Sequence, residues 1–332
     1  MTQWAAGLIR LALSLTAIIF LSSQVQSQPY PSRPVRVIIP FPPGGPVDVL
    51  ARAMGEEFRV RTGQPFIVEN RPGGGTAIGA TACKSAAPDG YTFCILTVST
   101  IAINPFIEDN LAYDPEKDFA PVSNLVRARS ILLLHNSVPA NNIAELVAYS
   151  KQYPDKLSYA SFGTGGAAHL RIEWMLKQTG ASMLHVPFSG VAPAMLAFER
   201  GDVHLLGPVV TPQILEKIRS GGGKAILTQD IKRDPDLPDV PMELEAGLPL
   251  LKFDNWFGAL APSATPPDRI EFLSRTIVDI VKQPKFRAQY VHAVGMDLIA
   301  DTPAEFGQSL AEQREKAREL IEISGVKKAR GK

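Results

Sequence analysis

Two glycine-rich loops hold the residues of this chain whose types and spacing could do chemistry. The first reads Phe-Pro-Pro-Gly-Gly-Pro-Val-Asp at residues 41–48, and the second reads Ser-Phe-Gly-Thr-Gly-Gly-Ala-Ala-His at residues 161–169. Each lies between a predicted strand and a predicted helix. A helix N-terminus carries unbonded N–H groups and a partial positive charge, and glycine lets the backbone approach an anion closely. The two loops therefore predict a cleft that holds a carboxylate or a similar anion from both sides.

The first loop is expected to contact the ligand mainly through its backbone. Gly44 and Gly45 are expected to present N–H groups, with Phe41 as an apolar wall and Pro43 beside it. Asp48 has two interpretations. It caps its own helix by accepting from early N–H groups, which is the role we favour, or it orders a water that an ammonium or hydroxyl of the ligand also uses.

The second loop is expected to supply backbone donors and one side-chain hydroxyl at its helix N-terminus, from Thr164, Gly165, Gly166 and Ala167. Hydroxyl contacts are also expected from Ser161 and Ser99. His169 lies one turn inside the helix, where packing is favoured over ligand contact. His204 could add positive charge when protonated, although a buried neutral histidine is favoured. Phe188 is either an apolar wall of the cleft or a core residue.

The composition excludes some classes of protein. The chain has 332 residues with 34 Lys and Arg against 33 Asp and Glu, so its net charge of +1 argues against nucleic-acid binding. Hydrophobic residues at 45% and charged residues at 20% are typical of a globular protein long enough for two domains. We expect a monomer without cofactor or metal.

The N-terminus predicts an exported protein. Arg10 precedes an apolar run at residues 11–21, which suits a signal peptide and is short for a membrane span. The predicted signal peptide covers residues 1–27, with cleavage between Ser27 and Gln28. Export permits disulfides, and Cys83 and Cys94 are the two cysteines of the chain. They are predicted on a helix and on the next strand, either bridged or as two buried apolar residues.

Short apolar strands alternate with amphipathic helices from residue 35 onward, which predicts an α/β fold with parallel-type sheets. A second unit of this kind begins near residue 131. Two such units, with crossings near residues 124–130 and 249–256, predict a hinged protein of two lobes. The rival class is an enzyme, because residues 163–168 match a dinucleotide-binding G-x-G-x-x-A pattern. No acidic residue ends the next strand to hold a ribose, so we do not expect an enzyme.

The order and spacing of many short motifs resemble the tripartite tricarboxylate transporter receptors, the TctC or Bug family of periplasmic solute-binding proteins. The resemblance runs from about residue 34 to residue 324. Its motifs lie at residues 42–45 with Asp48 and Arg52, 69–73, 87–92, 104–105, 113–115, 118–122, 161–170, 185–190, 237–241, 245–247, 256–258 and 261–262.

The resemblance implies a type II flytrap fold with lobe 1 at residues 28–126 and 256–332 and lobe 2 at residues 127–255. It implies a periplasmic receptor that closes on a small organic carboxylate and delivers it to a membrane permease; a ligand sensor for a membrane signalling partner is the alternative. The segment from Ser99 to Asn104 is expected to line the cleft. The chain departs from the family pattern at His204 and at Gly207-Pro208, which are expected near the cleft floor.

Overall fold

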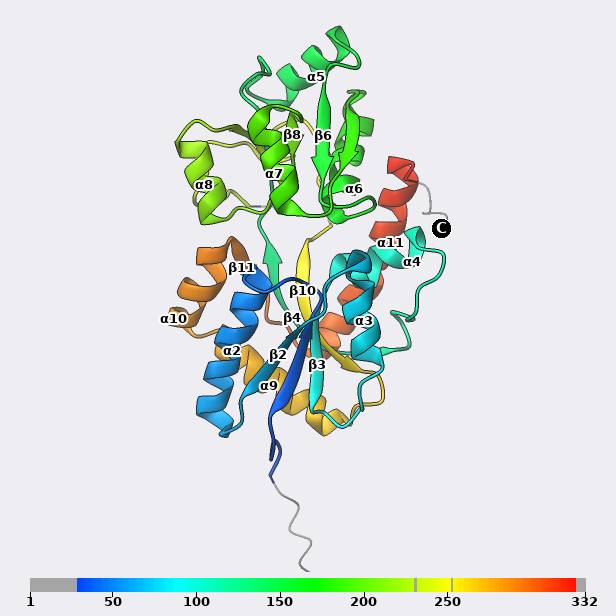
Figure 1. The fold of residues 1–332 in the computed structure, drawn as a ribbon, viewed down its shortest axis with the longest axis vertical. Helices are drawn as coiled ribbons and strands as arrows, with labels where there is room; N and C mark the ends of the chain where they lie inside the picture. Colours follow the sequence, from blue (N-terminus) through cyan, green and yellow to red (C-terminus); the bar gives the residue numbers. More distant parts are fainter. Residues whose placement is uncertain (1–28, 230–231, 252, 327–332) are drawn as a thin grey trace, which may run out of the picture. The chain divides into compact units, whose positions relative to one another are not determined.

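The computed structural model describes residues 29–229, 232–251 and 253–326. The predicted signal peptide lies outside the described residues. The chain from Pro34 onward clusters as one unit, and the following description concerns that unit alone (Figure 1). Within the described ranges, no helix combines the length and the apolar character that a membrane span needs.

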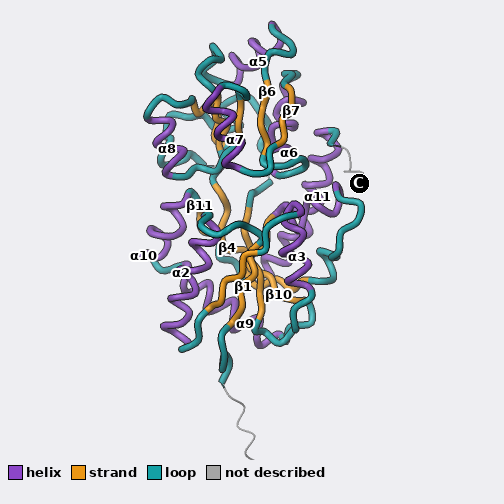
Figure 2. Tube along the Cα trace, viewed as in Figure 1, coloured by secondary structure: helices purple, strands orange, loops and turns teal. Residues whose placement is uncertain are grey.

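The first sheet has six strands in the order β11-β4-β10-β3-β1-β2. Strand β1 pairs in parallel with β2 and β3, whereas β10 runs antiparallel to both β3 and β4, and β11 runs antiparallel to β4. Helix α2 lies to one side of these strands and helix α3 to the other (Figures 1 and 2). The strands are β1 (Val35–Ile39), β2 (Phe66–Asn70), β3 (Thr92–Thr97), β4 (Phe119–Ala128), β10 (Trp256–Pro262) and β11 (Met296–Leu298).

The second sheet has five strands in the order β7-β6-β8-β5-β9. Strand β6 pairs in parallel with β7 and β8, and β5 runs antiparallel to β8 and β9. The chain passes from the first sheet to the second between β4 and β5 and returns between β9 and β10. The lobe limits given above stay a prediction. The strands are β5 (Ile131–Leu134), β6 (Ser158–Ser161), β7 (Leu184–Pro187), β8 (Leu205–Leu206) and β9 (Lys224–Thr228).

Both sheets are mixed, which corrects the expectation of parallel-type sheets. The antiparallel member β10 reads Trp-Phe-Gly-Ala-Leu-Ala-Pro, a sequence rich in small residues and closed by proline, so it lacks the usual strand pattern. Its Gly258 faces the ring of Phe306, which occupies the space that a Cβ would need. The need for glycine at position 258 therefore comes from Phe306, a residue that lies far away in the sequence.

The helices begin and end where local chemistry requires it. Pro46 is the first residue of α2, Val47, Leu50 and Met54 bury its apolar face, and Gly63 ends it with φ at 75°. Residues 284–294 form three short helical pieces. The helices are α2 (Pro46–Thr62), α3 (Ala77–Lys84), α4 (Asn104–Ile107), α5 (Ile143–Gln152), α6 (Ala167–Thr179), α7 (Val191–Arg200), α8 (Pro212–Arg219), α9 (Pro267–Val281), α10 (Pro284–Phe286) and α11 (Pro303–Ser324), with 3-10 turns η1 (Gly74–Thr76) and η4 (His292–Val294) and π-helices η2 (Ser99–Ile103) and η3 (Arg287–Val291).

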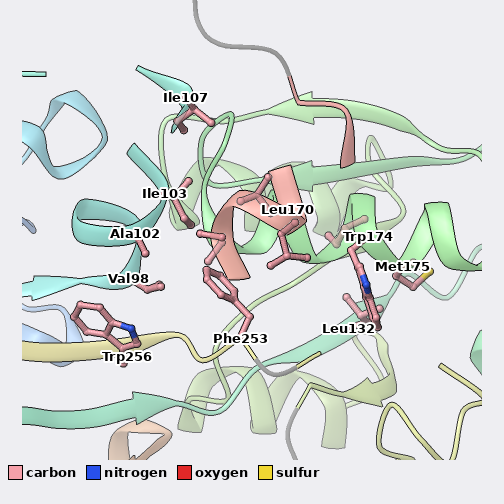
Figure 3. Close-up of a cluster of buried hydrophobic side chains, with 14 of the residues drawn as sticks. Val98, Ala102, Ile103, Ile107, Leu132, Leu170, Trp174, Met175, Phe253 and Trp256 are labelled. Atoms are coloured by element: carbon pink, nitrogen blue, oxygen red, sulfur yellow. The ribbon is translucent and has the colours of Figure 1, made fainter. Parts of the chain in front are cut away.

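A single hydrophobic cluster contains buried side chains from both sheets. It joins Val98 and Ile103 of the first half to Leu170 and Trp174 of helix α6, with Trp256 at its edge (Figure 3). Along β5 the side chains alternate. Leu132 and Leu134 enter this cluster, while Ile131 and Leu133 enter a second cluster on the other face of the sheet. Strand β5 is therefore covered on both faces.

Cys83 of α3 and Cys94 of β3 form a disulfide, with their Cα atoms 6.1 Å apart. The sequence left two interpretations of these cysteines open, and the structure confirms the disulfide. Both residues are also fully buried in the hydrophobic cluster. The bridge ties helix α3 to the centre of the first sheet.

Reduction of this disulfide is expected to lower the free energy of unfolding by about 2–3 kcal/mol, because it releases a short closed loop in the unfolded chain. Urea unfolding of the oxidised and the reduced wild-type protein measures the difference. Thiol labelling in denaturant without a reductant serves as the control, and labelled cysteines in that sample would show that the bridge does not form.

Candidate functional site

The two glycine-rich loops both follow the carboxyl ends of parallel strands. Strands β1, β2 and β3 are parallel, so the loops after them leave the same edge of the first sheet. Strands β6, β7 and β8 are likewise parallel, and the second glycine-rich loop follows β6. This edge of an α/β sheet is where ligands bind in such folds.

Asp48 is the centre of the first loop. Its side chain is only 3% exposed and accepts from the Gly44 N–H at 2.9 Å, from Arg52 Nε at 3.0 Å and from Asn70 Nδ2 at 3.0 Å. Burial alone would raise the pKa of Asp48, but the hydrogen bonds from Arg52, Gly44 and Asn70 outweigh it and lower the pKa to about 2. Asp48 therefore has a structural role and stays ionised at neutral pH, but it holds the loop before the helix and does not cap the helix itself, which corrects the expected capping role.

The donors that remain in the first loop belong to the start of α2. Gly45 begins this helix in an extended conformation and has no side chain to cap it. The first intrahelical bond runs from the Val49 N–H to the Gly45 carbonyl, so the N–H groups of Val47 and Asp48 have no acceptor within the helix. Phe41 is half-buried, with its ring edge-to-face on Phe257 at 6.0 Å. Pro43 is exposed.

The segment after β3 joins the loop after β2 by hydrogen bonds. Thr76 Oγ1 lies 2.7 Å from Thr100 Oγ1, and Asn104 Nδ2 donates to the Gly75 carbonyl at 2.9 Å. Asn104 is buried and therefore positions these loops, while Ser99 is half-buried at the start of η2. Ligand contact by either residue stays a prediction.

The second loop has the same plan as the first. Gly166 begins α6 in an extended conformation, and the first intrahelical bond runs from the Leu170 N–H to the Gly166 carbonyl. The first-turn N–H groups of Ala167 and Ala168 therefore have no acceptor within the helix. The Gly165 N–H is already used, because it donates to His169 Nδ1 at 2.9 Å. Thr164, at the tip of the loop, is exposed.

Gly165 connects the second loop to the first half of the protein. It is buried with φ at 77°, and the Cδ1 atom of Ile107 in α4 occupies the place where its Cβ would be. Ile107 thus brings the segment after β3 against the loop after β6. The motif analysis missed Ile107, and an isoleucine three residues after Asn104 carries no signal that would single it out.

Beneath the second loop lies a polar cluster of stacked rings. The rings of His169 and His185 stack at 3.9 Å, and Tyr159 stacks on His185 at 4.9 Å. Ser161 is fully buried, donates to the Gly163 carbonyl at 3.1 Å and lies 2.7 Å from His185 Nε2. The sequence reasoning missed His185; its position directly opposite Tyr159 on the neighbouring strand is visible only once the strands are paired.

Two predicted residues are not brought to the loop tips. His204 lies before β8, where its Nδ1 accepts from the Ser158 N–H at 3.1 Å, at the end of β6 opposite to the glycine-rich loop. Burial lowers the pKa of His204, so a neutral ring is favoured there. Phe188 is half-buried and packs against the second hydrophobic cluster, while its N–H donates to the Ser161 carbonyl at 3.0 Å.

A pocket of about 600 Å³ lies elsewhere, beside the passage from β4 to β5. Its lining includes Arg129, Leu215, Arg219, Asp236 and His292. Arg129 is buried and donates to both Asp234 and Asp236, at 2.8 Å and 3.0 Å, so its charge is already neutralised. We therefore place the candidate ligand site at the glycine-rich loops.

The chain belongs to the tripartite tricarboxylate transporter family of receptors, because the sequence profile of that family matches residues 50–326. This confirms the resemblance that the motifs predicted. The match includes most of the first glycine-rich helix, the whole second loop and the C-terminal helix α11.

Three solved structures are similar to this chain. The periplasmic binding protein BugD is 32% identical, with a TM-score of 0.79 over 90% of this chain and 100% of BugD. Rpa4515 of R. palustris, solved with adipate, is 28% identical, with a TM-score of 0.83 over 90% and 100% of the two chains. MatC (Rpa3494) from Rhodopseudomonas palustris, with bound malate, is 30% identical, with a TM-score of 0.77 over 88% and 100%. They confirm the α/β fold of a two-lobed periplasmic binding protein.

The substitution Asp48→Asn is expected to lower the free energy of unfolding by about 1–3 kcal/mol at pH 7, because it leaves Arg52 without its charged partner. The pKa of Asp48 falls from 3.8 to about 2 on folding, so the advantage of the wild type is complete above pH 4 and is lost as the pH falls toward 2. Urea unfolding between pH 7 and pH 3 measures this, with the exposed Asp239→Asn as the control. A difference between Asp48→Asn and the wild type that does not change with pH would contradict it.

Proposed function

We propose that this protein is an exported receptor that binds a small organic carboxylate between its two glycine-rich loops. The observation that carries the proposal is the state of the two helix N-termini. Helices α5, α8 and α11 are capped by the side chains of Asn142, Thr211 and Thr302. Helices α2 and α6 follow Gly45 and Gly166, as α7 follows Gly190, and these glycines have no side chain to cap them, so the first-turn N–H groups are left for an external acceptor.

The chemical class of the ligand is supported by the relatives. Adipate and malate, named with two of the similar structures, are both dicarboxylates. A carboxylate accepts several N–H hydrogen bonds at once, and bonds to a charged acceptor each contribute about 1.5–3 kcal/mol. A carboxylate bound by both helix starts would favour the closed arrangement of the loops.

Binding without catalysis is part of the proposal. Ser161 and His185 are spaced like a nucleophile and its base, at 2.7 Å. However, Ser161 is 0% exposed and its hydroxyl proton is directed to the Gly163 carbonyl, so this pair supports the loop. Delivery of the solute to a membrane permease from the periplasm is the finer role that membership of the family supports.

The proposal is tested on protein recovered from the periplasmic fraction. The intact mass of this protein should equal that of a chain whose first residue is Gln28. Thermal-shift measurements with malate, adipate and citrate should show stabilisation by at least one acid, by about 2.7 kcal/mol when the acid is present at one hundred times its Kd. The diamine 1,4-diaminobutane is the matched control. Equal responses to acids and diamine, or no response to any acid, would reject a carboxylate receptor.

The contact between Gly165 and Ile107 gives a second test. Gly165→Ala should weaken binding of the best acid by about tenfold or more, because the new methyl group meets Ile107 and the left-handed backbone disfavours alanine. Ile107→Ala removes the clash, so the double variant should bind more tightly than Gly165→Ala alone. Titration calorimetry gives the Kd values of the wild type, the two single variants and the double variant, which together form a double-mutant cycle. Strictly additive effects would show that the contact does not shape the site.

A further inference from the structure

The two glycine-rich loops share one backbone plan. Each has a glycine in the left-handed region, with φ at 85° for Gly44 and 77° for Gly165, directly before the glycine that begins the helix. In each, the side chain of the third helical residue reaches back to that glycine. Asp48 accepts the Gly44 N–H at 2.9 Å. His169 accepts the Gly165 N–H at 2.9 Å, so the loops differ in the charge of the acceptor.

The hydrogen bonds define the protonation of both histidines. His169 Nδ1 accepts from an N–H and therefore carries no proton, which places the ring proton on Nε2, 3.9 Å from Glu173 Oε1. Ser161 has one hydroxyl proton and donates it to Gly163, so His185 Nε2 must donate to Ser161. Both rings are neutral in this arrangement.

The surroundings of His169 keep it neutral. The titratable groups that face it are Tyr159 on β6, His185 on β7 and Glu173 on its own helix. The Tyr159 hydroxyl donates to Glu173. Burial, and secondarily the charge of His185, lowers the pKa of His169 to about 4, and burial also lowers the pKa of His185. At neutral pH, neither ring places a charge beneath the loop.

We propose that His169 is a positioning residue that fixes the second glycine-rich loop as a neutral acceptor, so that the N-terminus of α6 keeps its positive character for a ligand carboxylate. At the first loop the same position holds an ionised Asp48 within the first turn of α2, where its carboxylate, paired with Arg52 at 3.0 Å, takes the place that a neutral ring takes in the second loop. The α6 end is therefore the primary carboxylate subsite. The positioning role rests on the geometry, and the subsite assignment also rests on the proposed function.

Three substitutions of His169 by side chains of nearly equal shape separate the effect of the hydrogen-bond acceptor from the effect of a negative charge. His169→Asn keeps an acceptor near the place of Nδ1, His169→Asp keeps the acceptor and adds a negative charge, and His169→Leu removes the acceptor. All three lose the ring stacking equally, so comparisons among them isolate the two properties. Amide hydrogen exchange of Gly165, observed in the full mature chain labelled with ¹⁵N-glycine, reports the loop without any ligand.

The expected exchange at Gly165 is about tenfold faster in His169→Leu than in His169→Asn, because one hydrogen bond is lost. The expected affinity for malate, or for adipate if that acid binds the wild type more tightly, is about tenfold or more weaker in His169→Asp than in His169→Asn at pH 7, because of repulsion at short range. Equal exchange in the Asn and Leu variants would overturn the positioning role. Equal affinity in the Asn and Asp variants would overturn the subsite assignment.

The wild-type protein provides a test that needs no variant. ¹⁵N spectra of the histidine rings should show His169 and His185 as neutral Nε2–H tautomers at pH 7. A proton on His169 Nδ1 would overturn the positioning role even if every variant failed to fold. If the wild type binds none of the acids in the thermal-shift panel, the proposed function and the subsite assignment both fail. The tautomer and the exchange rates still decide the positioning role.

Discussion

The structure of the site depends on one constraint: a buried strand must turn into a helix within a few residues and leave the first N–H groups of that helix facing outward. A glycine in the left-handed region makes the turn, and the side chain of the third helical residue accepts a hydrogen bond from the N–H of that glycine. At the first loop Asp48 does this with support from Arg52 and Asn70. At the second loop His169 does it with the support of a ring stack. The proposals about ligand binding depend on these two hydrogen bonds, from the Gly44 N–H to Asp48 and from the Gly165 N–H to His169.

The parts of the fold that depend on neighbouring residues could be predicted from the sequence. Proline as the first helical residue and glycine just after the last one mark the ends of α2. A structural role for Asp48 could also be predicted, although the residue accepts from Gly44 in the loop and not from an early N–H of the helix. The second loop and the start of α6 could be predicted from the glycine-rich sequence that precedes the helix. The disulfide was one of two predicted outcomes, because Cys83 and Cys94 fall on adjacent elements.

The rest depends on residues that meet only after folding. Strand β10 is antiparallel, and Gly258 in it is small because Phe306 packs there, a relation that the local sequence does not contain. His185 becomes part of the loop support only through the pairing of β6 with β7. Ile107 reaches Gly165 across the two halves of the protein. His204, expected near the cleft floor, lies at the opposite end of β6 because β8 begins just after it.

The hydrophobic cluster that contains side chains from both sheets has a consequence for how this protein can be recombined with its relatives. Trp174 of α6 and Trp256 of β10 belong to the same cluster, although the chain passes between the sheets twice. A chimaera that takes one sheet from a relative would therefore join two unmatched surfaces of a single core. New ligand specificity is better obtained by exchanging the two glycine-rich loops with their third helical residues, because these lie at the sheet edges and leave both tryptophans of the shared core in place.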